Sequence, residues 1–270
     1  PRECGINRVI GEKGFCKVAY LPMVSSYGPH FGEEDVLVGV GGSGTIFFTG
    51  CNLGCVYCQN YDISQNMEGE EVPFESLAKM MLYLQNIGCH NINFVTPTHQ
   101  VPQILRALEI AIDMGLSIPL VYNTGGYDSV ETLKLLDGIF DIYMPDIKYS
   151  NEEFAKKYSL VDNYFYYARL AVKEMYRQVG DLKVDENGIA YRGLIVRHLV
   201  LPNNIAGSYE VLKFISEEIS KNTFVNIMRQ YYPTYRAYKF PELSRRITIS
   251  EYYDVLNIAK ELGLLRVITQ

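Results

Sequence analysis

The sequence lacks the features that mark several large classes of protein. No apolar stretch approaches the roughly 20 residues that a membrane-spanning helix requires, and no secretory signal opens the chain. The net charge of -6 argues against the broad basic surface that sequence-independent nucleic-acid binding needs. We therefore expect a cytoplasmic protein that binds neither a membrane nor nucleic acid.

The six cysteines do not form the pattern of a disulfide scaffold. Cys51, Cys55 and Cys58 lie in one loop, and the others are scattered through a chain that is large enough to need no disulfides. This distribution predicts a reducing compartment, which again suits the cytoplasm. An oxygen-sensitive metal cluster would survive in such a compartment.

The cysteine loop has the spacing C-x3-C-x2-C and follows an apolar, strand-like run. A cubane [4Fe-4S] cluster is usually held by one cysteine on each iron, so three thiolates leave one iron open to a small molecule. The competing interpretation is structural zinc, which takes four ligands, typically as two separated pairs. Within thirty residues of the loop the only histidine is His30. Cys4 and Cys16 would in principle complete a four-cysteine site or hold a second metal with other partners.

Apolar runs and helical segments alternate from Thr45 onward, as in repeated βα units around a parallel sheet. Barrels of roughly 250 residues are commonly single domains, so one main α/β domain is expected. The expected strands are residues 45–49, 91–95, 118–122, 140–144, 193–201 and 223–228, and the expected helices are residues 74–87, 101–114, 130–136, 152–158, 164–177, 209–220 and 250–262. These units predict a partial (β/α)6, TIM-like barrel.

The alternation divides the chain into three regions. Residues 1–40 form an N-terminal extension rich in glycine and turn signals, residues 41–235 form the partial barrel, and residues 236–270 form a C-terminal helical extension. We expect Ser250, with Glu251, to cap the final helix.

Polar residues gather where the predicted strands end, which is where parallel barrels place their working residues. The second strand is followed by Thr96, Thr98 and His99. A threonine hydroxyl can accept a hydrogen bond from an ammonium group. His99 is a candidate acid or base, and the plainer interpretation is a hydrogen-bonded loop histidine.

Charged residues follow the fourth and fifth strands. Asp146 and Lys148 are two residues apart and face the same side of an extended strand, so they form either a salt bridge or part of a site, and Asp146 is a candidate catalytic group. Arg197 and His198 point to opposite faces, and we expect Arg197 to face the interior. After the sixth strand, Gln230 or Arg229 is available to bind a ligand.

The cysteine loop resembles the cluster-binding signature of the radical S-adenosylmethionine (SAM) superfamily, with Tyr57 as the usual aromatic residue before the last cysteine. The sequence further resembles an uncharacterised subgroup homologous to pyruvate formate-lyase activating enzymes, in segments that include Pro-Arg-Glu-Cys-Gly-Ile-Asn-Arg and Val-Thr-Pro-Thr-His. The resemblance implies a radical SAM core with a [4Fe-4S] cluster on Cys51, Cys55 and Cys58. SAM would bind the open iron and be cleaved to methionine and a 5′-deoxyadenosyl radical that abstracts hydrogen from a substrate.

The same resemblance suggests roles for individual residues. In activating enzymes, the strand that Met144–Lys148 resembles has a lysine on the SAM carboxylate and an aspartate beside a monovalent cation. The sequence departs from them at Thr96, where they usually carry Gly-Gly-Glu-Pro, at Asn123, where they have aspartate, and near Gln230, where they often have histidine. The expected cofactor-binding residues are Tyr57, Thr96, Thr98, Asn123, Asp146, Lys148, Arg197 and Gln230.

The favoured interpretation is an oxidoreductase of the radical SAM type, such as a glycyl-radical-enzyme activase. It would act on a protein or peptide and take electrons from a reduced flavodoxin- or ferredoxin-type donor. One alternative is an iron–sulfur electron-transfer or sensor protein that does not cleave SAM. Another is a radical SAM enzyme that modifies RNA or peptides. The Tyr- and Arg-rich residues 235–246 could bind RNA by stacking on its bases and contacting its phosphates.

Overall fold

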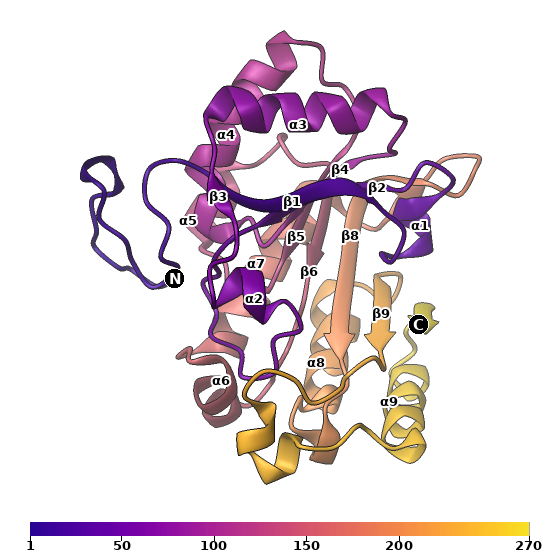
Figure 1. Ribbon diagram of the computed structural model, residues 1–270. Coiled ribbons are helices and arrows are strands. Elements are labelled where there is room, and N and C mark those ends of the chain that lie inside the picture. The colour runs from indigo at the N-terminus through magenta and orange to yellow at the C-terminus, as the bar shows by residue number, and fades with distance from the viewer. Residues whose placement is uncertain (270) are drawn as a thin grey trace.

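A curved sheet forms the centre of the computed structural model, which describes residues 1–269 (Figure 1). Its strand order is β10-β9-β8-β6-β5-β4-β2-β1-β3, and every neighbouring pair from β10 to β2 is parallel. The parallel strands are β2 (Ser43–Phe48), β4 (Ile92–Val95), β5 (Leu120–Thr124), β6 (Ile142–Pro145), β8 (Ala190–Leu199), β9 (Phe224–Met228) and β10 (Arg266–Thr269). Because β3 and β10 lie at opposite ends of this order, the barrel is open, as the partial (β/α)6 prediction requires.

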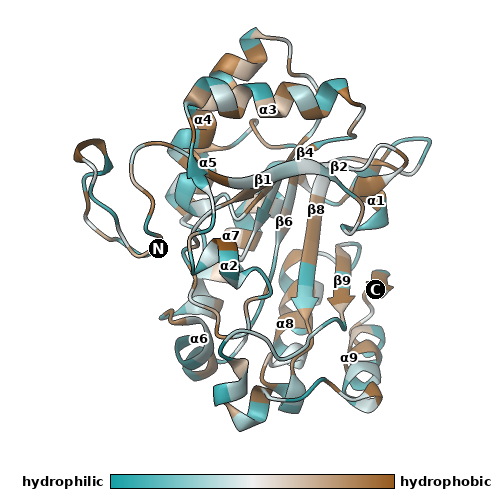
Figure 2. Ribbon diagram, in the orientation of Figure 1, coloured by the Kyte–Doolittle hydropathy of each residue, from teal (hydrophilic) through white to brown (hydrophobic). Residues whose placement is uncertain are grey.

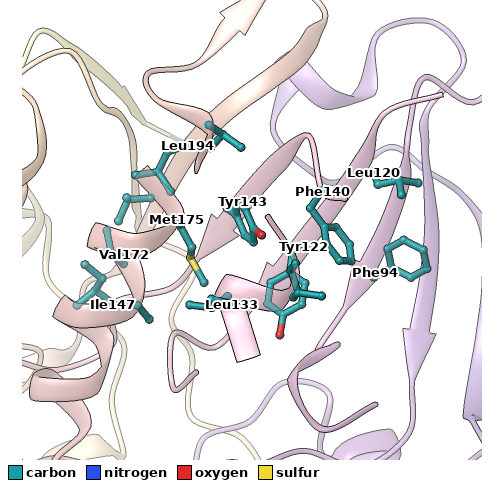
Figure 3. Packing of buried hydrophobic residues seen from close by; sticks show 14 of the residues in the cluster. Phe94, Leu120, Tyr122, Leu133, Phe140, Tyr143, Ile147, Val172, Met175 and Leu194 are labelled. Atoms are coloured by element: carbon teal, nitrogen blue, oxygen red, sulfur yellow. The ribbon is translucent and has the colours of Figure 1, made fainter. Parts of the chain in front are cut away.

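Helices that connect the strands cover the outer face of the sheet. They are α3 (Phe74–Asn86), α4 (Val101–Asp113), α5 (Val130–Leu135), α7 (Tyr164–Val179), α8 (Ser208–Phe214) and α9 (Ile249–Glu261). Outward-facing strand residues such as Phe94, Tyr122 and Tyr143 pack against them in the largest hydrophobic cluster (Figure 3). Since parallel strands are covered on both faces, their sequences are mostly apolar, which explains why they were recognisable.

The inner face of the barrel changes from apolar to polar along the strands. On this face Val121, Met144 and Ile195 pack with Leu37 of α1 (Asp35–Val38), so this short helix fills the apolar part of the barrel. Two residues further along, the same face carries polar side chains such as Arg197. Figure 2 shows β8 turning from hydrophobic to hydrophilic toward its C-terminal end.

Shorter elements surround this core. Strand β1 (Met23–His30) is antiparallel to both β2 and β3 (Glu70–Glu71), so part of the predicted N-terminal extension joins the sheet. Strand β7 (Lys183–Val184) pairs antiparallel with β8, and the short helices α2 (Tyr61–Ser64) and α6 (Glu152–Ser159) follow β2 and β6 in the chain. Single turns of 3-10 helix lie at Arg8–Ile10, Thr98–Gln100, Pro202–Asn204, Ala237–Lys239 and Pro241–Leu243, and a π-helical turn at Ile215–Ile219 follows α8.

Two expectations for the C-terminal region need correction. The final helix is capped by Thr248, not Ser250: the Thr248 side chain accepts from the Glu251 N–H, and the Glu251 carboxylate accepts from the Thr248 N–H. The seventh parallel strand, β10, was not expected. Among residues 1–269, no helix is both long and apolar enough to cross a membrane.

Candidate functional site

One cavity of about 260 Å³ lies at the C-terminal ends of the parallel strands. Its wall combines the cysteine loop with the residues that end β4, β5, β6, β8 and β9. The predicted site residues that line it are Cys51, Cys55, Tyr57, Cys58, Thr96, Asn123, Asp146, Lys148, Arg197 and Gln230. Segments spread over most of the sequence therefore meet in a single cavity.

The cysteine loop is fixed by docking on the end of α6. The N–H groups of Gly54 and Val56 donate to the carbonyls of Ser159 and Tyr158, both at 2.8 Å. These carbonyls belong to the last turn of the helix and have no partner within it, so the loop satisfies them. At the start of the loop, Gly50 has φ 83°, and a Cβ there would lie 2.5 Å from a backbone oxygen, which explains why glycine is needed.

Burial keeps the three thiols protonated when no metal is bound. It raises the pKa of Cys51 to about 12 and that of Cys55 to about 11, and it also raises the pKa of Cys58. Such thiols ionise when a metal replaces the proton. Within residues 1–269, no three His, Cys, Asp or Glu side chains surround a point that one metal ion could occupy. In a cubane cluster each thiolate binds a separate iron, so its ligands need not surround one point.

A buried charged network spans the cavity floor. Asp146 accepts from Lys148 Nζ at 2.5 Å through Oδ2 and from Arg197 Nε at 2.8 Å through Oδ1. Asp146 and Arg197 are partners in a parallel β-bridge, which places their side chains together. Burial opposes the charge on Asp146, but Arg197 and Lys148 outweigh it and lower the pKa of Asp146. Burial also opposes the charge on Lys148, but Asp146 outweighs it and raises the pKa of Lys148. All three groups are therefore charged.

Arg197 also holds the amide of Asn123, to which its Nη2 donates at 2.6 Å. Asn123 and Asp146 are the positions at which the resemblance suggested a monovalent cation. In this structure a guanidinium bridges their oxygens. His198, the neighbour of Arg197, faces away from the cavity and bonds to the Ile147 carbonyl and the Ser208 hydroxyl.

Glu33 is a member of this network that the sequence did not reveal. It lies between β1 and α1, and its Oε2 accepts from Arg197 Nη1 at 3.3 Å. Burial raises its pKa to about 7, although Arg197 opposes the shift; Glu34 and Asp146 add to it. No local motif marks this residue, because only the antiparallel pairing of β1 with β2 carries it into the barrel.

Thr96 has a backbone conformation that its residue type disfavours. It directly follows β4 and has φ 60°, in the left-handed region where a β-branched residue is an outlier. Glycine would adopt this conformation freely. The cost at Thr96 is on the order of 1–3 kcal/mol, and the strain lies at the cavity wall.

Thr98 and His99 lie outside this cavity lining. The Thr98 hydroxyl bonds to Asp128 at 2.8 Å and Thr124 at 2.9 Å. His99 is buried, with Nε2 at 2.9 Å from the Thr49 carbonyl, and burial lowers its pKa to about 4. Both residues instead line a second cavity of about 310 Å³.

The second cavity also receives Cys4 and Cys16 from the N-terminal segment. The cysteine loop contributes Asn52 to its wall, and Cys16 accepts from Arg8 Nη2 at 3.2 Å. These two cysteines are therefore not among the residues that line the first cavity beside Cys51, Cys55 and Cys58.

Comparison with known proteins identifies the family. The model of the radical SAM superfamily matches residues 45–180. An uncharacterized protein of Methanocaldococcus jannaschii is 35% identical over 272 residues, covering 97% of this chain and 73% of that protein.

Two solved structures share the fold. The FeFe-hydrogenase maturase HydG from Carboxydothermus hydrogenoformans has TM-score 0.55 and 14% identity, over 82% of this chain and 50% of that one. The structure of native anSMEcpe with bound AdoMet and Cp18Cys peptide has TM-score 0.55 and 14% identity, over 81% of this chain and 60% of that one. The chain belongs to the radical SAM superfamily, which implies a [4Fe-4S] cluster and SAM as its cofactors.

Proposed function

We propose that the cavity at the strand ends holds the cluster on Cys51, Cys55 and Cys58, with SAM beside it on the open iron. The observation that carries this proposal is the shared lining: three thiols and the polar ends of five strands surround one cavity. When bound, the cluster supplies the electron that divides SAM into methionine and a 5′-deoxyadenosyl radical able to take hydrogen from a substrate.

The residues around the thiols suit the two ends of SAM. Lys148 is placed to bind the carboxylate, because a single bond to Asp146 leaves it further N–H donors. Oxygens at Thr96 and Asn123 suit the ammonium group. Met228 lines the cavity and supplies an apolar wall for the adenine, whereas the neighbouring Ile227 packs in the outer core.

Tyr57 and Gln230 complete the proposed binding site. Tyr57 is buried in the loop, with its ring centroid 6.3 Å from Tyr149 and 5.8 Å from Tyr231, so it supports the loop from behind. Gln230 follows β9, and its carbonyl accepts from Gln59 at 3.2 Å. This bond joins the end of the barrel to the cysteine loop.

We further propose a protein or peptide substrate, as for a glycyl-radical-enzyme activase. The support is the resemblance of the Met144–Lys148 strand to that of the activating enzymes. Enzymes that modify RNA remain the second candidate, because a basic and aromatic segment borders the site. It contains five cations and one carboxylate in residues 229–246, whereas the rest of the chain has a net charge of -10.

That basic segment also suits the surface of an acidic electron donor. It packs directly on the cysteine loop: the Arg236 N–H donates to the Val56 carbonyl at 2.8 Å, and Tyr235 stacks on Tyr61 with ring centroids 5.0 Å apart. Opposite charges steer protein association and raise its rate. We propose that a reduced flavodoxin- or ferredoxin-type protein docks here.

An anaerobic assay tests the enzymatic function. The protein is reconstituted with iron and sulfide, analysed for both elements, and incubated with SAM and dithionite. Methionine and 5′-deoxyadenosine are expected as products, and a variant with all three loop cysteines changed to alanine is the control. A loaded protein that forms neither product is an electron-transfer or sensor protein, and zinc in place of iron and sulfide indicates a structural metal site.

A further inference from the structure

Each sulfur of the cysteine loop has a hydrogen-bond partner, and the three partners come from three different segments. The backbone of the loop, helix α2 and helix α6 contribute one each. The contacts are Leu53 N to Cys51 Sγ at 3.3 Å, Ser64 Oγ to Cys58 Sγ at 3.2 Å, and Ser159 Oγ to Cys55 Sγ at 3.0 Å. No part of the C-x3-C-x2-C spacing predicts the two serines.

The direction of the serine hydrogen bonds follows from their other partners. A thiolate that binds a metal has no hydrogen to donate, so Ser159 must donate to Cys55. Its single hydrogen is then used, and Tyr149, whose Oη lies 2.9 Å from Ser159 Oγ, must donate to it. The result is a relay that runs from Tyr149 through Ser159 to the sulfur.

Ser64 has the same arrangement beside Cys58. The Gln65 side-chain amide donates to Ser64 Oγ at 3.4 Å and to the Leu53 carbonyl at 3.0 Å. Because an amide nitrogen only donates, the hydroxyl hydrogen of Ser64 is left for the sulfur. Each serine is thus oriented by a second fixed side chain.

The relay at Cys55 is buried away from solvent. Ser159 and Tyr149 are fully buried, and the backbone carbonyl of Ser159 accepts from the Gly54 N–H at 2.8 Å. Helix α6 therefore fixes the loop with its backbone and orients a hydroxyl toward the sulfur with the same residue. In such a dry environment a hydrogen bond to a charged group is strong.

We propose that Ser159 and Ser64 are positioning residues that raise the reduction potential of the cluster, and that Tyr149 and Gln65 orient them. This inference rests on the proposed function. One-electron reduction adds negative charge that the ligand sulfurs share, so a donor on a sulfur stabilises the reduced form more than the oxidised form. Losing a donor should therefore make the cluster harder to reduce.

The test is a redox titration of the reconstituted protein with dithionite, followed by electron paramagnetic resonance. Ser159→Ala should lower the equilibrium constant for reduction about tenfold, which is ~59 mV for a one-electron couple. Ser64→Ala should shift it in the same direction, and Tyr149→Phe should do so by less, because it acts through Ser159. Ser159→Thr keeps the hydroxyl and should restore most of the potential.

A matched control separates this effect from the loss of any buried serine. Ser216 is also buried, and its hydroxyl donates to the Leu262 carbonyl at 2.7 Å. It belongs to the π-helical turn after α8 and is distant from the cysteine loop in sequence. Ser216→Ala should leave the potential unchanged. Midpoints are read from the loaded fraction, so partial cluster loss in a variant does not affect them.

The outcomes distinguish the two proposals. If the unmodified protein binds no iron and sulfide, the proposed function fails. If it binds them and the Ser159→Ala and Ser64→Ala variants keep its midpoint potential, the inference about the serines fails and the proposed function stands. An equal shift in the Ser216→Ala control also overturns the inference, because the effect would then be a general one of destabilisation.

Discussion

The substitution Asp146→Asn tests whether the charged network is truly desolvated. Asp146 lies between Lys148 and Arg197, and the side chains of these three residues are 15%, 18% and 16% exposed. Asparagine keeps the size of the side chain and removes its charge. Two buried cations would then face each other without a carboxylate between them.

The expected cost is large because the partners stay buried. Removing one member of a buried ion pair typically costs ~3–5 kcal/mol, against ~0.2–1 kcal/mol for an exposed pair. The free energy of unfolding of a whole domain is only about 5–15 kcal/mol. At ~2 °C per kcal/mol for a chain of this length, we expect the Tm to fall by about 6–10 °C.

Urea unfolding of the metal-free protein measures this effect without any contribution from the cluster. The matched control is Asp137→Asn, since the ion pair of Asp137 with Arg177 is exposed, with side chains 45% and 55% accessible; it should cost less than ~1 kcal/mol. Because the folded-state pKa of Asp146 lies below its ordinary 3.8, its stabilisation is present above that value and is lost as the pH falls below it. Equal, small effects of the two substitutions at pH 7 would refute the reasoning.

Three further outcomes are expected. The free energy of unfolding of the Glu33→Gln variant, relative to that of the parent protein, should rise by about 3 kcal/mol at most between pH 4.5 and pH 7. The reason is the raised pKa of Glu33: the stabilisation by its protonated form is present at low pH and is lost through that range. If the stabilities of variant and parent, measured by urea unfolding, changed in parallel with pH, this would be contradicted. SAM binding measured by calorimetry should be the same in sodium and potassium salts, since Arg197 occupies the candidate cation position; a tenfold difference, ~1.4 kcal/mol, would disprove it. Thr248→Ala should cost ~1 kcal/mol in urea unfolding and Ser250→Ala under ~0.5 kcal/mol, and the reverse order would restore the Ser250 cap.

The strands and the gathering of the site were predictable because both depend on local pattern. Buried parallel strands are nearly continuous apolar runs, and their C-terminal ends share one edge of the sheet, so residues as distant as Cys51 and Gln230 could be assigned to one cavity. The last strand, β10, was missed because a short apolar run after a helix fits several structures. Its pairing with β9 is a tertiary property.

The remaining features depend on contacts between segments that no spacing encodes. Glu33 enters the barrel only because β1 pairs with β2, and Ser159 meets Cys55 only because α6 docks on the loop. The left-handed backbone of Thr96 runs against the preference of its residue type, so a sequence-based argument would assign it an ordinary conformation. Such conflicts between local preference and structure are typical of functional sites.

The network also decides between the two cations as ligands for SAM. All three guanidinium nitrogens of Arg197 donate, to Asp146, Asn123 and Glu33, whereas Lys148 Nζ has one hydrogen-bonded partner among residues 1–269. Two of the five N–H groups of Arg197 are left by these bonds, but a carboxylate that reached them would lie among three acceptors, including the carboxyl groups of Asp146 and Glu33. A carboxylate that approached Lys148 would meet Asp146 alone and use an ammonium hydrogen that is still available. We therefore infer that Lys148 binds the SAM carboxylate directly and that Arg197 acts by holding Asp146, which fixes the ammonium group of Lys148 at the cavity wall.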